Sequence, residues 1–180
     1  ISAVEIESGE LIWQSSTQST LTYDDGYFLK TSEIIANAQT LFFSNNKDQF
    51  YSLDIKTGGV NWKQKINSNL RPTLIDNYIF TISLKGYLFI IEKNSGNIIR
   101  ITDLFKSIKP KIRNKILPTG FIVGKNNIYL TTDHGRLLTV DIASGKVIKI
   151  IKIDKNKITR PSILNDNLFI ITDNSILKLN

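Results

Sequence analysis

Cysteine and methionine are absent from the 180-residue chain, and histidine occurs once, at His134. The lack of cysteine excludes disulfide bonds, thiolate metal sites and cysteine nucleophiles. A single histidine also excludes a histidine-rich metal site and a relay of several histidines. Because there is no methionine, residue 1 is not a natural start, and we expect a mature or trimmed product.

Long hydrophobic runs are also missing. The longest apolar stretches, such as YLFII and IIKI, have the length of strands, whereas a span of the bilayer needs about 20 apolar residues. The opening residues, ISAVEIESGE, are acidic and lack the apolar region of a signal peptide. With 41 % hydrophobic and 22 % charged residues, the composition is that of a globular chain.

Negative charge is scarce, and the net charge of +7 is unevenly distributed. The tract 105–117 holds five Lys or Arg and no acid, and the tract 146–160 holds six with one Asp. Such clusters bind phosphates or anionic membranes. A general excess of Ile, Lys and Asn would produce the same charge on a solvated surface without any ligand, and we favour that reading.

One pattern occurs four times: AVEIESGELIW, SLDIKTGGVNW, IIEKNSGNIIR and TVDIASGKVIK. Each copy is an alternating apolar strand, an acid followed three residues later by Ser or Thr, a glycine, and a second strand. The glycines are Gly9, Gly58, Gly96 and Gly145, at spacings of 49, 38 and 49 residues. Self-similarity at about 40–50 residues is typical of propeller blades and other arrays.

The residues of the repeated turn explain its shape. Acidic and hydroxyl side chains accept or donate hydrogen bonds to the backbone just ahead of them, and the glycine accepts a positive φ. We therefore predict hairpins with a bulge beside the glycine. The turn residues are Asp54, Thr57 and Gly58; Asp141, Ser144 and Gly145; Glu5, Ser8 and Gly9; and Glu92, Ser95 and Gly96.

A second hairpin precedes each complete copy, so one unit holds four short strands. Repeated four-stranded antiparallel units predict an all-β fold, a β-propeller. We expect three full blades, at about 32–66, 71–104 and 118–153, and two partial ones, at 1–16 and 159–180. Either the two ends complete a fourth blade and close a small ring, or the chain is an arc of a seven- or eight-bladed ring. We favour the arc.

The repeat resembles the PQQ-like repeat, which occurs in quinoprotein dehydrogenases and in propellers that are not enzymes. YSLDIKTGGVNW matches it most fully, and AVEIESGELIW keeps the glycine and the tryptophan. Arg100 and Lys149 stand in the place of the tryptophan in the other two copies. Trp13 and Trp62 are expected to pack between blades, because a buried indole contributes a large apolar area and needs one partner for its N–H.

The order of features is similar to the C-terminal half of outer-membrane assembly lipoproteins of the BamB type. A long connection follows the first tryptophan repeat, a basic connection precedes the penultimate blade, and the chain stops after a short hairpin. The resemblance implies a non-enzymatic protein-binding scaffold without a cofactor, working with the outer-membrane assembly machinery and not with nucleic acid. It also implies a monomer within a complex, at the periplasmic face of the bacterial outer membrane, held by an anchor outside this chain.

An alternative is a quinoprotein (PQQ-dependent) dehydrogenase or its non-catalytic remnant. Such enzymes hold the cofactor on the propeller axis with a tryptophan floor, a calcium site, a catalytic Asp and a vicinal disulfide. This chain has no cysteine and no recognisable calcium loop, and Asp54 and Asp141 are turn residues first. His134 is expected to be an exposed residue of a hairpin tip.

The segment TYDDGYF has two acids and three aromatic residues in a long connection, a composition found on partner surfaces. Its aromatic residues would alternatively cover the edge of a blade. Residues that we expect to bind a protein partner are Tyr23, Asp24, Asp25, Tyr27, Phe28, Lys30 and Glu33. A further hypothesis is that the tract 105–117 binds an anionic surface.

Overall fold

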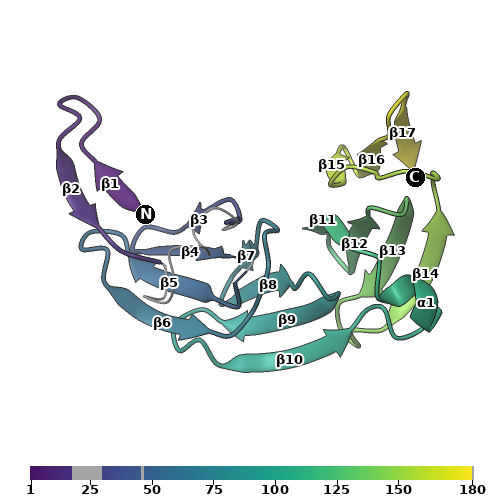
Figure 1. Cartoon of the computed structure of the whole chain (residues 1–180), viewed down its shortest axis with the longest axis horizontal. Coiled ribbons are helices and arrows are strands. Elements are labelled where there is room, and N and C mark those ends of the chain that lie inside the picture. The colour runs from purple at the N-terminus through teal and green to yellow at the C-terminus, as the bar shows by residue number, and fades with distance from the viewer. Residues whose placement is uncertain (18–29, 46, 180) are drawn as a thin grey trace. The chain divides into compact units, whose positions relative to one another are not determined.

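The computed structural model describes residues 1–17, 30–45 and 47–179. In these residues the chain forms β-strands and one short helix. The chain is divided into two compact units, an N-terminal unit, Ile1–Pro72, and a C-terminal unit, Thr73–Asn180. Each unit is built from separate small antiparallel sheets, whose strands are labelled in Figure 1.

The N-terminal unit contains a two-stranded and a four-stranded sheet. The two-stranded sheet pairs β1 (Ser2–Val4) with β2 (Leu11–Gln14). The four-stranded sheet has the order β3-β4-β5-β6, with β3 at Ile35–Ala36, β4 at Thr40–Ser44, β5 at Phe50–Asp54 and β6 at Val60–Gln64. Neighbours in the chain are neighbours in the sheet, as short hairpin turns require.

The C-terminal unit repeats this arrangement in three sheets. One is formed by β7 (Thr73–Ile75), β8 (Tyr78–Ile82), β9 (Tyr87–Glu92) and β10 (Ile98–Asp103). The next is formed by β11 (Pro118–Val123), β12 (Asn127–Thr132), β13 (Arg136–Asp141) and β14 (Val147–Lys152). The last has three strands, β15 (Ser162–Leu164), β16 (Asn167–Ile171) and β17 (Ile176–Leu179).

All strand pairs within the sheets are antiparallel, and three sheets have four strands. The predicted fold class, all-β with four-stranded propeller blades and partial ones, is therefore confirmed. Each sheet lies inside one of the five predicted ranges, although the limits of the blades in an intact ring stay a prediction.

The second and third strands of each four-stranded sheet carry the core. Phe42 and Phe50 are fully buried on β4 and β5, as are Ile79 on β8 and Leu138 on β13. The fourth strands, β6, β10 and β14, are mostly exposed or half-buried. Inner strands such as β5 and β8 are buried along nearly their whole length, so both of their faces are covered, whereas the outer strands face water.

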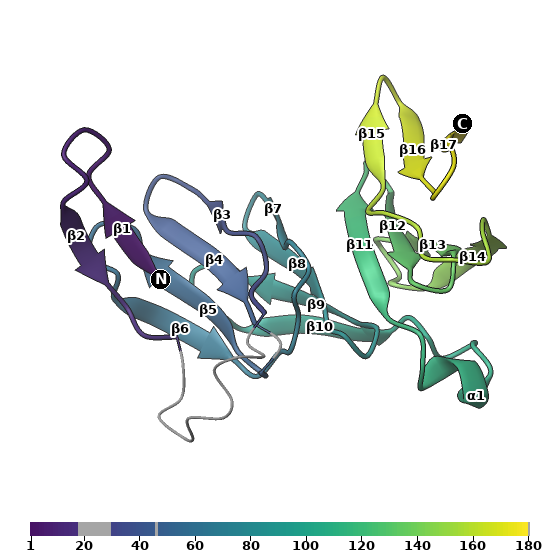
Figure 2. The ribbon, with the colours of Figure 1, turned by 45° about the horizontal axis from the view of Figure 1, so that its top comes forward.

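The connection between β10 and β11 contains the single helix of the described residues, α1 (Pro110–Arg113) (Figure 2). Pro110 begins the helix, because a residue in the first turn needs no N–H partner inside the helix.

A membrane-spanning helix is not found in the described residues, since none of their helical segments is long and apolar enough.

Candidate functional site

The four repeated turns share one backbone geometry. Their glycines have φ values of 72°, 70°, 74° and 72° at Gly9, Gly58, Gly96 and Gly145. Each glycine N–H donates to the carbonyl of the acid that opens the turn, at 2.8–2.9 Å. A register shift follows beside every turn, between the strand before it and the strand after it. The common geometry is that of a hairpin with a bulge, and it demands a left-handed residue at the fourth place after the acid.

The carboxylates of these turns bind the residues next to them. Asp54 Oδ1 accepts hydrogen bonds from the backbone N–H of Thr57 at 2.8 Å, the Thr57 hydroxyl at 2.9 Å and the N–H of Lys56 at 3.0 Å. These bonds, with the Thr57 hydroxyl first, hold the pKa of Asp54 below its ordinary value. Ser144, through its hydroxyl and its N–H, lowers the pKa of Asp141 in the same way.

The two glutamates form weaker versions of this arrangement. Glu92 accepts hydrogen bonds from the N–H groups of Ser95 at 2.7 Å and Asn94 at 3.2 Å, and its pKa is lowered chiefly by Ser95. Glu5 accepts from the N–H of Ile6 at 3.0 Å. The acids of all four turns therefore form hydrogen bonds within their own turns.

Trp13, the tryptophan of the first copy of the repeat, connects two sheets of the N-terminal unit. Trp13 on β2 donates its indole N–H to the carbonyl oxygen of Ile55, at 3.0 Å, in the turn after β5. The ring lies against Gly58 of the same turn, where an added Cβ would overlap the indole. The Ser15 hydroxyl donates to the carbonyl of Gly58. Trp13 thus binds the next repeated turn through one hydrogen bond and one packed face.

Arg100 makes the corresponding contact in the C-terminal unit. Its Nη1 donates to the carbonyl oxygen of Ile142, at 2.8 Å, in the turn after β13. The arginine also packs on Gly145, where an added Cβ would lie 3.2 Å from Nη1. Donor and acceptor are 42 residues apart in both cases. From the sequence, Arg100 was predicted only to stand in the place of the tryptophan. Its equal position in the repeat was the signal that it could make the same contact.

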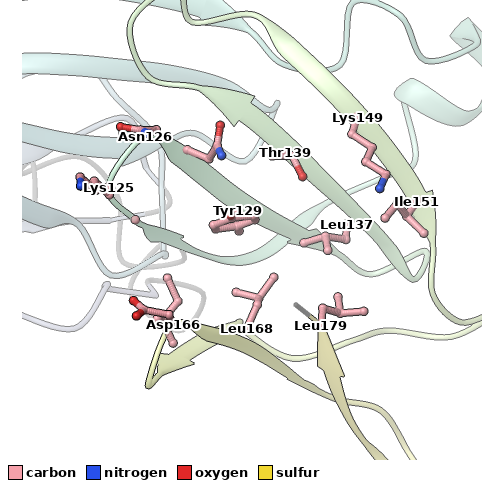
Figure 3. Close-up of a pocket in the computed structure, with 13 residues that line it drawn as sticks. Lys125, Asn126, Tyr129, Leu137, Thr139, Lys149, Ile151, Asp166, Leu168 and Leu179 are labelled. Atoms are coloured by element: carbon pink, nitrogen blue, oxygen red, sulfur yellow. The ribbon is translucent and has the colours of Figure 1, made fainter.

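Trp62 and Lys149 hold the same position in the other two copies of the repeat. Trp62 on β6 stacks on Phe50 of its own sheet, with ring centroids 5.9 Å apart and planes inclined by 11°, and lies near Phe42. Lys149 on β14 instead lines a pocket of about 430 Å³ between the sheet of β11–β14 and that of β15–β17 (Figure 3).

The pocket has an apolar wall and a few charged groups. Leu137 and Leu168 are buried core residues on its two sides, and Tyr129 and Leu179 pack against the same cluster. Lys125, Lys149 and Asp166 are its charged lining residues. In the described part of the chain, no three His, Cys, Asp or Glu side chains gather as a metal site would require.

Most residues predicted to bind a partner, Tyr23, Asp24, Asp25, Tyr27 and Phe28, lie outside the described residues. Lys30 and Glu33 are described and exposed. Glu33 forms an ion pair with Arg71 at 3.3 Å, and both side chains stay accessible to solvent. Contact of Lys30 and Glu33 with a protein partner stays a prediction.

His134 lies in the turn after β12 and is partly exposed. Its Nδ1 is 2.8 Å from Asp133 Oδ1, which also accepts a hydrogen bond from the N–H of Leu117. The carbonyl of His134 accepts a hydrogen bond from Lys152 Nζ at 2.8 Å. Asp133 and His134 therefore connect this turn to Leu117, before β11, and to Lys152, at the end of β14.

Four-stranded sheets whose third and fourth strands are joined by acid–hydroxyl–glycine turns define the class of the protein as a β-propeller of PQQ-like repeats. A family model described as outer membrane protein assembly factor BamB matches residues 1–102, more than half of the chain. The chain belongs to this family, which confirms the resemblance seen in the repeats.

Individual relatives are distant. The outer membrane protein assembly factor BamB of Legionella pneumophila (strain Paris) is 22 % identical over 148 residues, which are 79 % of this chain and 33 % of that protein. The chain thus spans about a third of the length of the curated relative that it matches.

Solved structures show the same fold. The crystal structure of BamB from Moraxella catarrhalis aligns with a TM-score of 0.55 and 15 % identity, over 97 % of this chain and 64 % of that one. The computationally designed Ika4 protein aligns with a TM-score of 0.62 and 12 % identity, over 82 % of this chain and 91 % of that one. Identities this low support the architecture only.

Proposed function

We propose that this chain is part of a non-enzymatic scaffold that binds proteins during outer-membrane protein assembly, at the periplasmic face of that membrane. The match of residues 1–102 to the BamB family model carries this proposal. The Legionella pneumophila relative is itself an outer membrane protein assembly factor by name. Protein partners, a peripheral position at the membrane and an anchor outside these residues all belong to the proposal.

The local geometry supports a binding role over a catalytic one. The carboxylates of Asp54 and Asp141 are engaged by the backbone and hydroxyl groups of their own turns. Trp13 is engaged with the carbonyl of Ile55, and Trp62 is stacked on Phe50. Residues that a quinoprotein would use as a catalytic acid or a cofactor floor therefore have structural partners here, which favours the scaffold over the quinoprotein alternative.

Binding would use exposed loops and sheet edges. In the two complete four-stranded sheets of the C-terminal unit, the outer strands β10 and β14 each pair with one neighbouring strand, so their other edges present backbone groups outside the sheet. An edge of this kind accepts an extended strand of a partner through main-chain hydrogen bonds. The long connection with Tyr23, Tyr27 and Phe28 would provide the aromatic anchors of a second contact.

A crosslinking experiment tests the proposal. A photoreactive amino acid at Lys30 or Glu33 is expected to crosslink to a periplasmic domain of the barrel-assembly machinery of the source bacterium, identified by mass spectrometry. The same amino acid at Lys56, in the turn after β5, is the matched control and should give no such product. Absence of the crosslink at both predicted positions, together with unchanged outer-membrane protein levels on loss of the gene, would contradict the proposal.

A further inference from the structure

The strand order of the C-terminal unit separates its loops into two sets. In a four-stranded antiparallel sheet, the turn between the second and third strands lies at the same end as the connection to the next sheet. Hydrogen bonds show this directly: the N–H of Leu104 donates to the carbonyl of Gly86, at 3.0 Å, and the N–H of Ile153 to that of Gly135, at 2.8 Å. We call this end the connection face; it consists of the loops 83–86, 104–117, 133–135, 153–161 and 172–175.

The remaining loops lie at the opposite end, which we call the turn face. Here the N–H of Lys93 donates to the carbonyl of Asn77, at 2.9 Å, and the N–H of Ile142 to that of Asn126, at 3.0 Å. The turn face consists of the loops 76–77, 93–97, 124–126, 142–146 and 165–166.

Positive charge is concentrated on the connection face. In residues 73–179, all described, its loops contain nine Lys or Arg and three Asp. The loops of the turn face contain three Lys and two Asp, and Glu92 and Asp141 stand at the strand ends beside them. The connection-face loops are also longer, 34 residues against 17, so the number of lysines alone does not separate the two faces. Net charge does, at +6 against +1, and the difference comes mainly from the connection 104–117, which holds five of the nine basic residues and no acid.

The connection 104–117 forms a fixed platform for its lysines. Leu104, Phe105, Ile108 and Ile116 are buried, and an added Cβ at Gly86 would overlap the ring of Phe105. A loop held by four buried apolar side chains keeps its charges in place.

The arginine of this connection is already engaged. Arg113 Nη2 lies 2.6 Å from Asp103 Oδ2, and both side chains are partly buried. The four lysines are exposed, and their ammonium groups make no hydrogen bond or ion pair with any described residue; they are Lys106, Lys109, Lys111 and Lys115. Uncompensated like charges within about 10 Å of one another produce a joint field that attracts an anionic surface.

We propose that the connection face of the C-terminal unit binds an anionic lipid surface through these lysines. A protein interface would use anchors such as Trp, Tyr or free Arg, whereas Phe105 is buried and Arg113 is paired. Single-stranded nucleic acid would need exposed aromatic rings for stacking, and the connection 104–117 has none exposed. Lysine is a point charge on a flexible stem that needs no fixed partner geometry, which suits phosphate headgroups that diffuse in the membrane plane.

Flotation with vesicles tests this directly. The chain is mixed with vesicles of phosphatidylcholine alone, or with about one third phosphatidylglycerol, in low salt. We expect binding to the anionic vesicles only, and its loss when salt rises to about 0.5 M. The triple variant K106Q/K109Q/K111Q should lower the partition coefficient about 100-fold, since each lysine near the surface contributes about a fivefold factor.

The matched control removes the same amount of positive charge from the turn face of the same unit. The triple variant K93Q/K125Q/K146Q should keep binding within about threefold of the unchanged chain, because lysines far from the membrane are screened. Five of the six side chains are exposed and Lys93 is half-buried at the surface, so both variants are expected to melt near the temperature of the unchanged chain.

Three results would overturn the proposal. The first is no binding of the unchanged chain to anionic vesicles in low salt. The second is an equal loss of vesicle binding in both triple variants, which would show that binding depends on the net charge of the chain and not on one face. The third is tight binding to soluble polyphosphate or single-stranded DNA without binding to vesicles. Crosslinking to assembly proteins is independent of all three, so failure here leaves the proposed scaffold function standing.

Discussion

Two contacts between neighbouring sheets, one in each unit, have the same geometry and different chemistry. Trp13 binds the carbonyl of Ile55 and packs on Gly58, whereas Arg100 binds the carbonyl of Ile142 and packs on Gly145. Indole and guanidinium are both flat groups with an N–H donor at the edge. The repeat therefore requires at this position a flat side chain that can donate a hydrogen bond to the carbonyl of the next repeated turn, and both tryptophan and arginine meet this requirement.

Truncating the first contact should have the largest effect. Trp13→Ala removes the packed indole and leaves the Ile55 carbonyl without its donor, and we expect a loss of about 3 kcal/mol in the free energy of unfolding. Trp13→Arg should recover part of this loss, because arginine serves at position 100. Urea unfolding of both variants measures the difference, and an arginine variant as unstable as the alanine variant would show that the two contacts are not equivalent.

The glycines under the contacts come next. Gly58→Ala is expected to cost about 2–3 kcal/mol, because it combines a left-handed backbone with overlap on Trp13. Gly9 has nearly the same φ, but an added Cβ there meets nothing within 4 Å, so Gly9→Ala isolates the backbone cost of about 1 kcal/mol. Equal losses in the two variants, measured by urea unfolding, would mean that the indole does not press on Gly58.

Removing the second contact should have a smaller effect. Arg100→Ala is expected to destabilise the chain by about 1–2 kcal/mol, because a charged donor is lost but little apolar area is exposed. Arg100→Lys retains the charge and the stem but not the flat donor edge. Thermal unfolding should place the lysine variant between the alanine variant and the unchanged chain; a fully stable alanine variant would contradict a structural role for Arg100.

The smallest effect concerns the acids of the turns. The folded pKa values of Asp54, Glu92 and Asp141 are lowered, so their contribution to stability is present above about pH 4 and is lost as the pH falls through the folded values. We expect the melting temperature to fall with acidification below about pH 4. Asp54→Asn should make this fall shallower than in the unchanged chain, and an identical pH profile would show that Asp54 contributes nothing to it.

Much of the fold could be predicted, because the repeated turn is a local structure. Asp54, Thr57 and Gly58 lie within five residues and make their hydrogen bonds to one another, so their pattern in the sequence carries the geometry. The helix α1 was not predicted, because its four residues are too few to show a helical period in the sequence.

The sequence by itself determined where the strands and turns lie, because period-two alternation and the acid–hydroxyl–glycine turn act over a few residues. Only the tertiary structure decided that Arg100 reaches Ile142, 42 residues away, since a contact between sheets depends on how they are joined. Tertiary structure also decided that the connections 104–117 and 153–161 emerge at the same face of the sheets. The physical reason is that antiparallel pairing sends every second loop to the same end, whatever its charge.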